Sequence, residues 1–351
     1  MHVNIQSWNN NHYLLKCSLS QHNPDVILLN ETSAVNKVLK IYGYKAIHKC
    51  VEYYAGVAIF VKCNIAFNFL EFDDPNILAI KVKTALGPLI IVTSYTPPRY
   101  DALPSVTINK ILNFKLPTVF ISDFNATHPL FDNTNNKNNS NSKGKQLNTI
   151  INAKNLTYLG PDFETFCQGN RRGKPDLIIC NSSFRLFHHL IQQGEPVGSD
   201  HVPIIFKIQT KPFIILNRNK RNLSKINIDK YKENLSSQQF QNLDGEHFTS
   251  IDNTLSNIEN VINAATELSC PLISNKVVKS YSPTKEIKTK LKHLQGLYHS
   301  YYLTSTPSIQ IINSFKRDLL WDIKIHSKKQ WDSIVKLAFE CYEILEKSQN
   351  P

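Results

Sequence analysis

The segment Thr118-Val119-Phe120-Ile121-Ser122-Asp123-Phe124-Asn125 joins an apolar, strand-like run to a carboxylate and an amide. The same arrangement recurs in Gly198-Ser199-Asp200-His201-Val202-Pro203-Ile204, and Glu31 ends a third apolar run. Each cluster alone is compatible with an ordinary turn, because Asp and Asn favour turns. Three such clusters at strand ends are together typical of a metal-dependent site that cleaves phosphodiesters.

The first 210 residues alternate short β-rich runs with loops and a few helical stretches. This pattern predicts two packed sheets with helices outside them. The predicted strands are Val3–Ile5, Val26–Leu29, Gly56–Val61, Ile77–Val82, Leu89–Ser94, Val119–Ser122, Leu177–Ile179 and Pro203–Ile208, and the predicted helices are Tyr13–Ser20, Ser105–Asn113 and Gly144–Lys154.

The composition is that of a folded, basic protein. With 351 residues, the chain exceeds the usual size of one core, so we expect one large domain and an appendage. A hydrophobic content of 41% argues against general disorder. The net charge of +12 favours a polyanionic partner.

Cysteine usage and the N-terminal sequence predict a soluble, intracellular protein. The seven cysteines form no CxxC pair and no His-linked zinc spacing, which is typical of reduced thiols. The start of the chain lacks the basic and apolar regions of a signal peptide. No apolar run reaches the length of a membrane span, so no membrane partner is expected.

The composition changes near residue 210. We predict a first domain over 1–209 and a basic linker with a helical region over 210–351. Trp321 and Trp331 suggest a small helical packing unit in the second part. A charged, solvated helix pair is the favoured interpretation of this region, with specific nucleic-acid recognition as the alternative. The polar stretch from Asp132 to Lys145 is expected to be a surface loop.

Several short strings resemble, in order, the endonuclease/exonuclease/phosphatase family, and within it the apurinic-type endonuclease domain of jockey-like non-LTR retrotransposons. The resemblance extends from about Val3 to Lys207. One string alone is a weak signal, whereas the shared order is specific. The strings are Gln6-Ser7-Trp8-Asn9, Leu29-Asn30-Glu31-Thr32, Ser94-Tyr95-Thr96-Pro97-Pro98, Ser122-Asp123-Phe124-Asn125, Lys174-Pro175-Asp176-Leu177-Ile178-Ile179 and Gly198-Ser199-Asp200-His201.

The resemblance implies a four-layer α/β sandwich with the active site at one rim and Mg²⁺, or Mn²⁺ in its place, as cofactor. A divalent cation neutralises phosphate oxygens and the leaving alkoxide. Magnesium needs only one or two protein carboxylates. Glu31 is the predicted ligand. Asn9 would support the metal shell or hold a phosphate oxygen, and Asp200 would assist the metal or its water.

The resemblance also assigns the catalytic roles. Asp123 would orient or deprotonate the attacking water, and Asn125 would hold that water or the phosphate. His201 would donate a hydrogen bond to the phosphate, with Asp176 raising its pKa. Tyr95 would contact the phosphate; the alternative is a tyrosine that only packs at the rim.

Four further residues are expected to contact nucleic acid. The resemblance implies this for His128 and Thr165, and Arg171 and Arg172 lie in a basic turn before Asp176. Arginine contacts to phosphate position a duplex without reading its sequence. A simple solvated turn is the alternative for the two arginines.

The chain departs from the family pattern at Asn30, where Gln usually precedes the glutamate, and at Ser122, where Gly is usual. Neither change removes an expected catalytic group. The resemblance therefore predicts a Mg²⁺-dependent endonuclease that nicks double-stranded DNA and leaves a 3′-hydroxyl to prime reverse transcription. The C-terminal basic region is a candidate site for the element's RNA, and a nuclear location follows from the DNA substrate.

Three alternatives stay open. The same fold serves apurinic-site nucleases and phosphoester phosphatases, and a non-catalytic nucleic-acid-binding relic would keep many of the same residues. No polymerase signature follows the resembling segment, so a fragment or truncated copy of an RNA-directed DNA polymerase is expected.

Overall fold

The computed structural model describes residues 1–52, 55–132, 140–214, 226–237, 262, 264–266, 268–270 and 284–349. Residues 1–214 and 281–351 form one compact unit, and residues 215–280 form a second. Most of the basic linker predicted after Thr210 lies outside the described residues. The predicted division at residue 209 stays a prediction.

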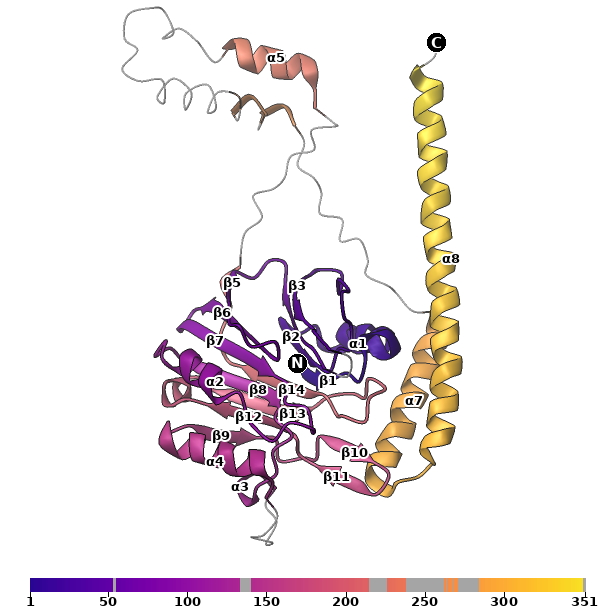
Figure 1. The fold of residues 1–351 in the computed structure, drawn as a ribbon. Helices are drawn as coiled ribbons and strands as arrows, with labels where there is room; N and C mark the ends of the chain where they lie inside the picture. The colour runs from indigo at the N-terminus through magenta and orange to yellow at the C-terminus, as the bar shows by residue number, and fades with distance from the viewer. Residues whose placement is uncertain are drawn as a thin grey trace, which may run out of the picture. The chain divides into compact units, whose positions relative to one another are not determined.

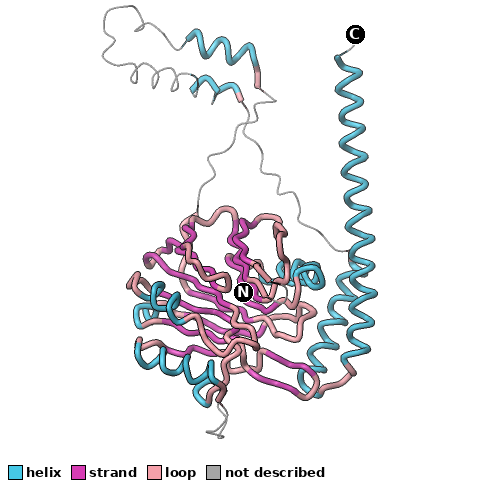
Figure 2. Tube along the Cα trace, in the orientation of Figure 1, coloured by secondary structure: helices cyan, strands magenta, loops and turns pink. Residues whose placement is uncertain are grey.

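Two six-stranded sheets form the body of the first unit (Figures 1 and 2). In each sheet one pair of strands is parallel, β1 with β2 and β7 with β8, and the other pairs are antiparallel. The first sheet has the order β13 (His189–Gln193), β14 (Ile204–Ile208), β1 (His2–Asn4), β2 (Val26–Asn30), β4 (Val57–Lys62) and β3 (Tyr44–Lys49). The second has the order β5 (Phe67–Leu70), β6 (Ile77–Thr84), β7 (Gly87–Ser94), β8 (Thr118–Asp123), β12 (Asp176–Cys180) and β9 (Thr157–Gly160).

Helices cover the outer faces of both sheets. Helix α1 (Trp8–His22) packs Leu15 and Leu19 on the first sheet. Helices α2 (Ser105–Leu112) and α4 (Ser142–Ala153) pack on the second sheet, with α3 (Pro129–Asp132) between them in sequence. The remaining elements of the body are the hairpin β10 (Phe166–Gln168) with β11 (Arg171–Gly173), and the 3-10 helix η1 (Ser182–Leu186).

The inner faces of the sheets meet in an apolar core. Val57 and Ile59 of the first sheet belong to the same buried cluster as Ile80, Val119 and Ile178 of the second. The alternation of apolar residues along these strands places one set inward and the other toward the helices. The four-layer α/β sandwich predicted from the sequence is therefore confirmed.

Strand pairing gathers the polar strand ends at one rim. Asn4 lies opposite Asn30 in the parallel β1–β2 pair, and Asp176 lies opposite Asp123 in the antiparallel β12–β8 pair. Tyr95 forms a bridge with Asp123 just beyond β7. Residues that are far apart in sequence thus share one edge of the sandwich.

Helices α7 (Lys285–Thr304) and α8 (Ile309–Gln349) pack on this body (Figure 1). Their apolar cluster includes Ile312 and Leu319 together with Leu14, Cys167 and Val202 of the body. The helical region after residue 284 was expected, but its contact with α1 and the β10–β11 hairpin was not. Trp321 does not act as a packing residue, because it is 62% exposed, and the Trp331 side chain lies outside the described part.

The second unit contains α5 (Ile228–Ser237) and the short helical stretch near residue 265. The Asn227 amide donates to the carbonyl of Ser269, which joins these two segments. Within the described parts of both units, no helix combines the length and the apolar composition that a membrane span needs.

Removing the last helices should destabilise the body. A fragment of residues 1–209 exposes Leu14, Cys167 and Val202, and burial of one such side chain is worth about 1.5–3 kcal/mol. We expect a free energy of unfolding lower by several kcal/mol, measured by urea titration. The control is a variant in which a Gly/Ser linker of the same length replaces residues 215–280. Its free energy of unfolding should stay close to that of the full chain. Equal stability of the fragment and the full chain would contradict the packing described.

Candidate active site

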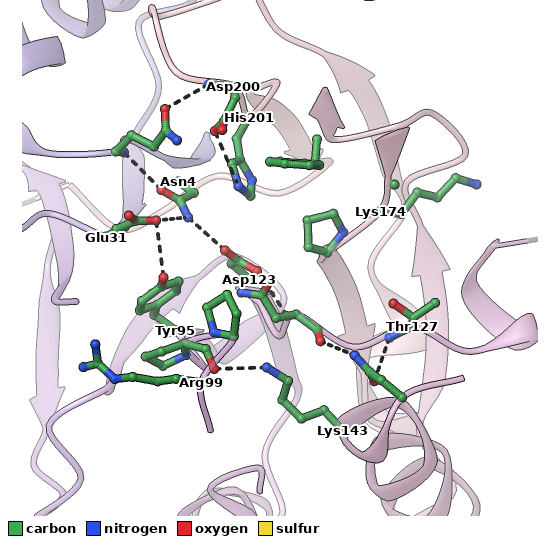
Figure 3. Close-up of a pocket in the computed structure, with 18 of the residues that line it drawn as sticks. Asn4, Glu31, Tyr95, Arg99, Asp123, Thr127, Lys143, Lys174, Asp200 and His201 are labelled. Carbon is green, nitrogen blue, oxygen red and sulfur yellow. Dashed lines mark hydrogen bonds and ion pairs between the residues drawn. The ribbon is translucent and has the colours of Figure 1, made fainter. Parts of the chain in front are cut away.

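A pocket of about 810 Å³ opens at the rim where the polar strand ends meet (Figure 3). Both sheets contribute to it, with Asn4 and Glu31 from the first and Tyr95 and Asp123 from the second. The loop that carries Asp200 and His201 forms another wall. The lining is completed by Gln6, Pro97, Pro98, Arg99, Asp101, Asn125, Thr127, Asn141, Ser142, Lys143, Glu164, Phe166, Arg172, Gly173, Lys174 and Pro175.

Asn4 connects the carboxylates of the two sheets. Its Nδ2 donates to Glu31 Oε2 at 2.8 Å and to Asp123 Oδ2 at 2.9 Å. Figure 3 shows the Asn4 side chain between these two acids. Glu31 has φ of 52°, a left-handed conformation that is uncommon outside glycine and that clusters at functional sites. Glu31 directly follows the last residue of β2, and its left-handed backbone conformation turns the carboxylate into the pocket.

Asp123 is fully buried at the end of β8. Burial raises the pKa of its carboxyl, and the nearby Asp176 raises it further, whereas His201 and the bond from Asn4 act against this, with a resulting value of about 7. Asn30 Oδ1 accepts from the Asp123 amide at 3.0 Å and fixes this strand end to the first sheet. A carboxylate with this pKa can both release and accept a proton near neutral pH.

Asp176 holds two imidazoles. His201 Nδ1 donates to Asp176 Oδ2 at 2.7 Å, and His2 Nε2 donates to Asp176 Oδ1 at 2.9 Å. Burial alone would lower the pKa of His201, but Asp176, Asp123 and Asp200 raise it to about 10. Burial alone would raise the pKa of Asp176, but the two histidines hold it well below its usual range. The pair is therefore an imidazolium and a carboxylate, with His201 Nε2 turned to the pocket side.

Three buried ligand atoms, one each from Asp123, Asp176 and His201, lie within 4.8 Å of one another. A metal between all three is chemically unfavourable, because a protonated imidazole is no ligand and Asp176 already serves two histidines.

Glu31 and Asp200 are better suited to hold a divalent cation. Burial raises the pKa of both carboxyls, and Asp200 raises that of Glu31 further. Asp200 Oδ1 is buried without a hydrogen-bond partner in the described structure, and it lies 3.9 Å from His201 Nε2. Two desolvated carboxylates with an unsatisfied oxygen fit a hard cation that keeps several waters.

Tyr95 and Lys143 complete the floor of the pocket. The Tyr95 hydroxyl donates to Glu31 Oε2 at 3.3 Å, and burial raises its pKa far above the usual value. Lys143 is only 4% exposed, and its Nζ donates to the Pro97 carbonyl at 3.0 Å. Burial lowers the pKa of this lysine while Asp123 and Asp101 act in the opposite direction. Lys143 therefore places its ammonium group where it interacts electrostatically with Asp123.

The loop with Asp200 and His201 is held by the C-terminal helices. Gly198 has φ of +84°, and a side chain there would collide with Leu14 and Lys316. The Tyr302 hydroxyl donates to the Ser199 carbonyl at 3.2 Å, and Lys316 Nζ donates to the Gly198 carbonyl. From the other side, Ser199 Oγ donates to the Asn4 carbonyl at 2.7 Å.

The structure brings most of the predicted residues to one place. Glu31, Tyr95, Asp123, Asn125, Asp200, His201 and Arg172 line the pocket, and Asp176 lies directly behind His201. Asn125 has φ of 48° and donates to the Thr96 carbonyl at 3.1 Å.

Two predicted residues are not placed as expected. Asn9 is exposed on the first turn of α1 and accepts from Lys37 Nζ at 3.0 Å, because β1 already ends at Asn4. Thr165 is fully buried and cannot face DNA; its hydroxyl accepts from the Asp176 amide at 3.3 Å.

His128 and Arg171 lie outside the pocket lining. The His128 ring accepts from the Leu130 amide at 3.2 Å, and Arg171 is exposed on the hairpin. Their predicted contacts with nucleic acid stay predictions.

Sequence reasoning missed Asn4, His2, Asn30 and Lys143. Asn4 could have been found from the sequence. It follows Val3 in the predicted first strand, and the next strand ends in an asparagine too, Asn30, which pairs with Asn4. His2 and Lys143 carry no comparable signal, because a histidine near a chain start and a lysine in a polar stretch are usually exposed.

Known sequences similar to this chain come from one family model and two mobile-element proteins. Residues 89–205 match the family model described as endonuclease-reverse transcriptase. The RNA-directed DNA polymerase from mobile element jockey of Drosophila funebris is 22% identical over 275 residues, which cover 73% of this chain and 29% of that protein. A probable RNA-directed DNA polymerase from transposon X-element of Drosophila melanogaster is 24% identical over 282 residues, covering 74% and 29%. The chain thus spans under a third of the length of these relatives.

Among solved structures, the endonuclease domain of TRAS1, a telomere-specific non-LTR retrotransposon, is similar to 59% of this chain and 96% of that domain, with 17% identity and a TM-score of 0.49. The resemblance to the endonuclease/exonuclease/phosphatase family and to jockey-like elements is confirmed by the family model and the two polymerase sequences.

The charge state of His201 can be tested by titration. We expect the imidazole to stay protonated through neutral pH and to titrate near pH 10 in NMR spectra of ring-labelled protein. Because the folded pKa lies above the unfolded value of 6.5, the interaction stabilises the fold below pH 6.5 and is lost as pH rises toward 10. Asp176→Asn should lower the His201 pKa more than Asp200→Asn does. A wild-type titration at pH 6.5 would contradict the assignment.

Divalent cation binding should depend on Glu31 and Asn4. Mg²⁺ at about ten times its Kd should stabilise the wild type by about 1.4 kcal/mol, measured as a Tm shift. Glu31→Gln should remove most of this shift, and Asn4→Ala should reduce it. Asn9→Ala is the matched control and should keep it. Loss of the shift in Asn9→Ala but not in Asn4→Ala would restore the original assignment.

Proposed function

We propose that the chain is a Mg²⁺-dependent DNA endonuclease that nicks one strand of a duplex by hydrolysis of a phosphodiester. The observation that carries this proposal is the buried imidazolium of His201, held by Asp176 opposite Asp123 in one pocket. A proton acceptor near neutral pH and a fixed cation in the same pocket suit attack of water on a phosphate.

Asp123 accepts a proton from the attacking water. Its pKa of about 7 leaves a substantial fraction of the carboxylate ready to act at neutral pH. Asn4 Nδ2 and the Asn125 amide, at 2.9 and 3.1 Å, hold the two carboxylate oxygens in place. Asn125 presents its side chain at the same pocket and orients the water or a phosphate oxygen.

His201 stabilises the charge that develops on the phosphate. Its Nδ1 proton is engaged by Asp176, so the Nε2 proton is the one available to a substrate. Asp176 positions the His201 ring and keeps it protonated. His2 donates a hydrogen bond to the other carboxylate oxygen of Asp176. Lys143, Arg172 and Lys174 add positive charge around the pocket, which favours a polyanionic substrate.

Glu31 and Asp200, with Asn4 orienting Glu31, are the residues that would hold the divalent cation. When bound, a divalent cation would supply neutralisation of the phosphate and of the leaving oxygen. Tyr95 supports Glu31 through its hydroxyl and faces the same pocket, where it can also contact the phosphate.

Double-stranded DNA is the proposed substrate, and the product is a nick with a 3′-hydroxyl that can prime reverse transcription. The names of the relatives support this proposal, because two are RNA-directed DNA polymerases of mobile elements and one is a retrotransposon endonuclease domain. A nuclear site of action follows from this substrate.

The activity can be measured as conversion of supercoiled plasmid to open circle. We expect nicking with Mg²⁺ and none with EDTA. Loss of one charge-stabilising group usually costs about 10²–10³ in rate, so His201→Ala and Asp123→Asn should each fall by at least this factor. His188→Ala, an exposed histidine outside the pocket, is the matched control and should nick at the wild-type rate.

Other outcomes separate the alternatives. Cleavage confined to apurinic sites, or release of phosphate from small phosphoesters without plasmid nicking, would replace the proposed substrate. Folded wild-type protein that binds Mg²⁺ and DNA but cuts none of these substrates would leave a binding protein without catalysis.

A further inference from the structure

A second hollow of about 890 Å³ is lined by residues of α1 and α8, helices whose places in the fold Figure 1 shows. The first turns of α1 contribute Asn9, Asn10 and Tyr13 to it. It shares no lining residue with the pocket at the rim. We call this hollow the α1–α8 groove.

The groove is positively charged. Helix α8 contributes Lys316, Arg317 and Lys324, and no acid is among the lining residues in the described structure. Lys316 is engaged by the Gly198 carbonyl. Arg317 and Lys324 are exposed and form no ion pair with any described residue, whereas the neighbouring Asp322 is paired with Lys290 of α7 at 2.8 Å. Two cationic side chains therefore face the groove without an ion-pair partner among the residues that the structure describes.

An exposed aromatic side chain lies between these cations. Trp321 lines the groove and is 62% exposed, although tryptophan is on average a highly buried residue. Arg317, Trp321 and Lys324 are spaced four and three residues apart, so they share one face of α8. The two cations are about 10 Å apart along the helix.

We propose that the α1–α8 groove binds a single-stranded nucleic acid, with Trp321 stacking on a base and Arg317 and Lys324 contacting phosphates. A basic groove that combines cations with an exposed aromatic face is typical of such binding. The amides of Asn9, Asn10 and Asn313 add donors and acceptors for base edges or ribose hydroxyls. A duplex is disfavoured, because its bases are already stacked and offer the indole no free face.

An acidic protein partner accounts for less of this surface. It would satisfy the cations but would leave the exposed indole and the row of amides unexplained. An apolar helix is disfavoured too, because Leu320, Trp321 and Tyr13 are the only apolar or aromatic residues in the groove of the described structure. The inference concerns binding alone, so it does not depend on phosphodiester cleavage.

Binding can be followed by tryptophan fluorescence of the full chain in EDTA, with oligothymidylate and oligouridylate of about twenty nucleotides as probes. We expect saturable quenching. Trp321→Ala should weaken binding, measured by anisotropy of labelled probe, by about tenfold, the usual effect of losing one stacked base. The double variant Arg317→Gln with Lys324→Gln should reduce the slope of log K against log salt by about 1.4, since each single-strand phosphate contact contributes about 0.7.

Lys292→Gln, an exposed lysine of α7 outside the groove, is the matched control and should keep the wild-type affinity and salt slope. Tighter binding of either probe supports the proposal and identifies RNA or DNA as the ligand. Two results would overturn it: wild-type affinity in both groove variants, or an equal loss for a duplex of the same length, which would indicate a general phosphate-binding surface. All variants are first compared with the wild type by circular dichroism and Tm.

Discussion

Two carboxylates buried side by side constrain this molecule more than any other feature. Asp123 and Asp176 are at most 1% exposed and lie directly opposite each other on β8 and β12. Buried charges of like sign are tolerated only where other groups compensate them. The compensation comes largely from the other sheet and its loop, through Asn4, His2 and His201. The polar network thus fixes how the two sheets meet, while the apolar core between them supplies most of the stabilisation.

The same network gives the two buried aspartates different pKa values. One of the two aspartates, Asp123, keeps a raised pKa because burial and its neighbour dominate. The other, Asp176, has a lowered pKa because two imidazoles surround it. Environments that push titratable groups apart in this way are a general route to acid–base chemistry at neutral pH. The chemistry proposed for the pocket depends on which carboxylate accepts hydrogen bonds from which imidazole or amide, and not on residue types alone.

The sequence predicted those parts of the fold that depend on local pattern. Long apolar runs such as Ile77–Val82 identified central strands. The polar residues Glu31, Asp123 and His201 at strand ends line one pocket, and their catalytic and metal-binding roles stay predictions. Edge strands were missed, because β13 is mostly exposed and β11 contains two arginines, so neither shows an alternating apolar pattern. The predicted strand Val3–Ile5 was only one residue off β1, whereas Asn9 was named from the resemblance and lies on the first turn of α1.

Contacts between distant segments were beyond such reasoning. The sequence of α7 does not predict the hydrogen bond from the Tyr302 hydroxyl to the Ser199 carbonyl, because the acceptor is a backbone atom about 100 residues away. This contact has a consequence for biosynthesis. The loop with Asp200 and His201 is translated about 120 residues before Ile323 completes the helical support. At about 5–20 residues per second, the ribosome needs roughly 6–24 s for that stretch. A nascent chain therefore carries Asp200 and His201 for seconds before the segment that holds their loop in place exists, so the proposed site can mature only after this part of α8 has been made.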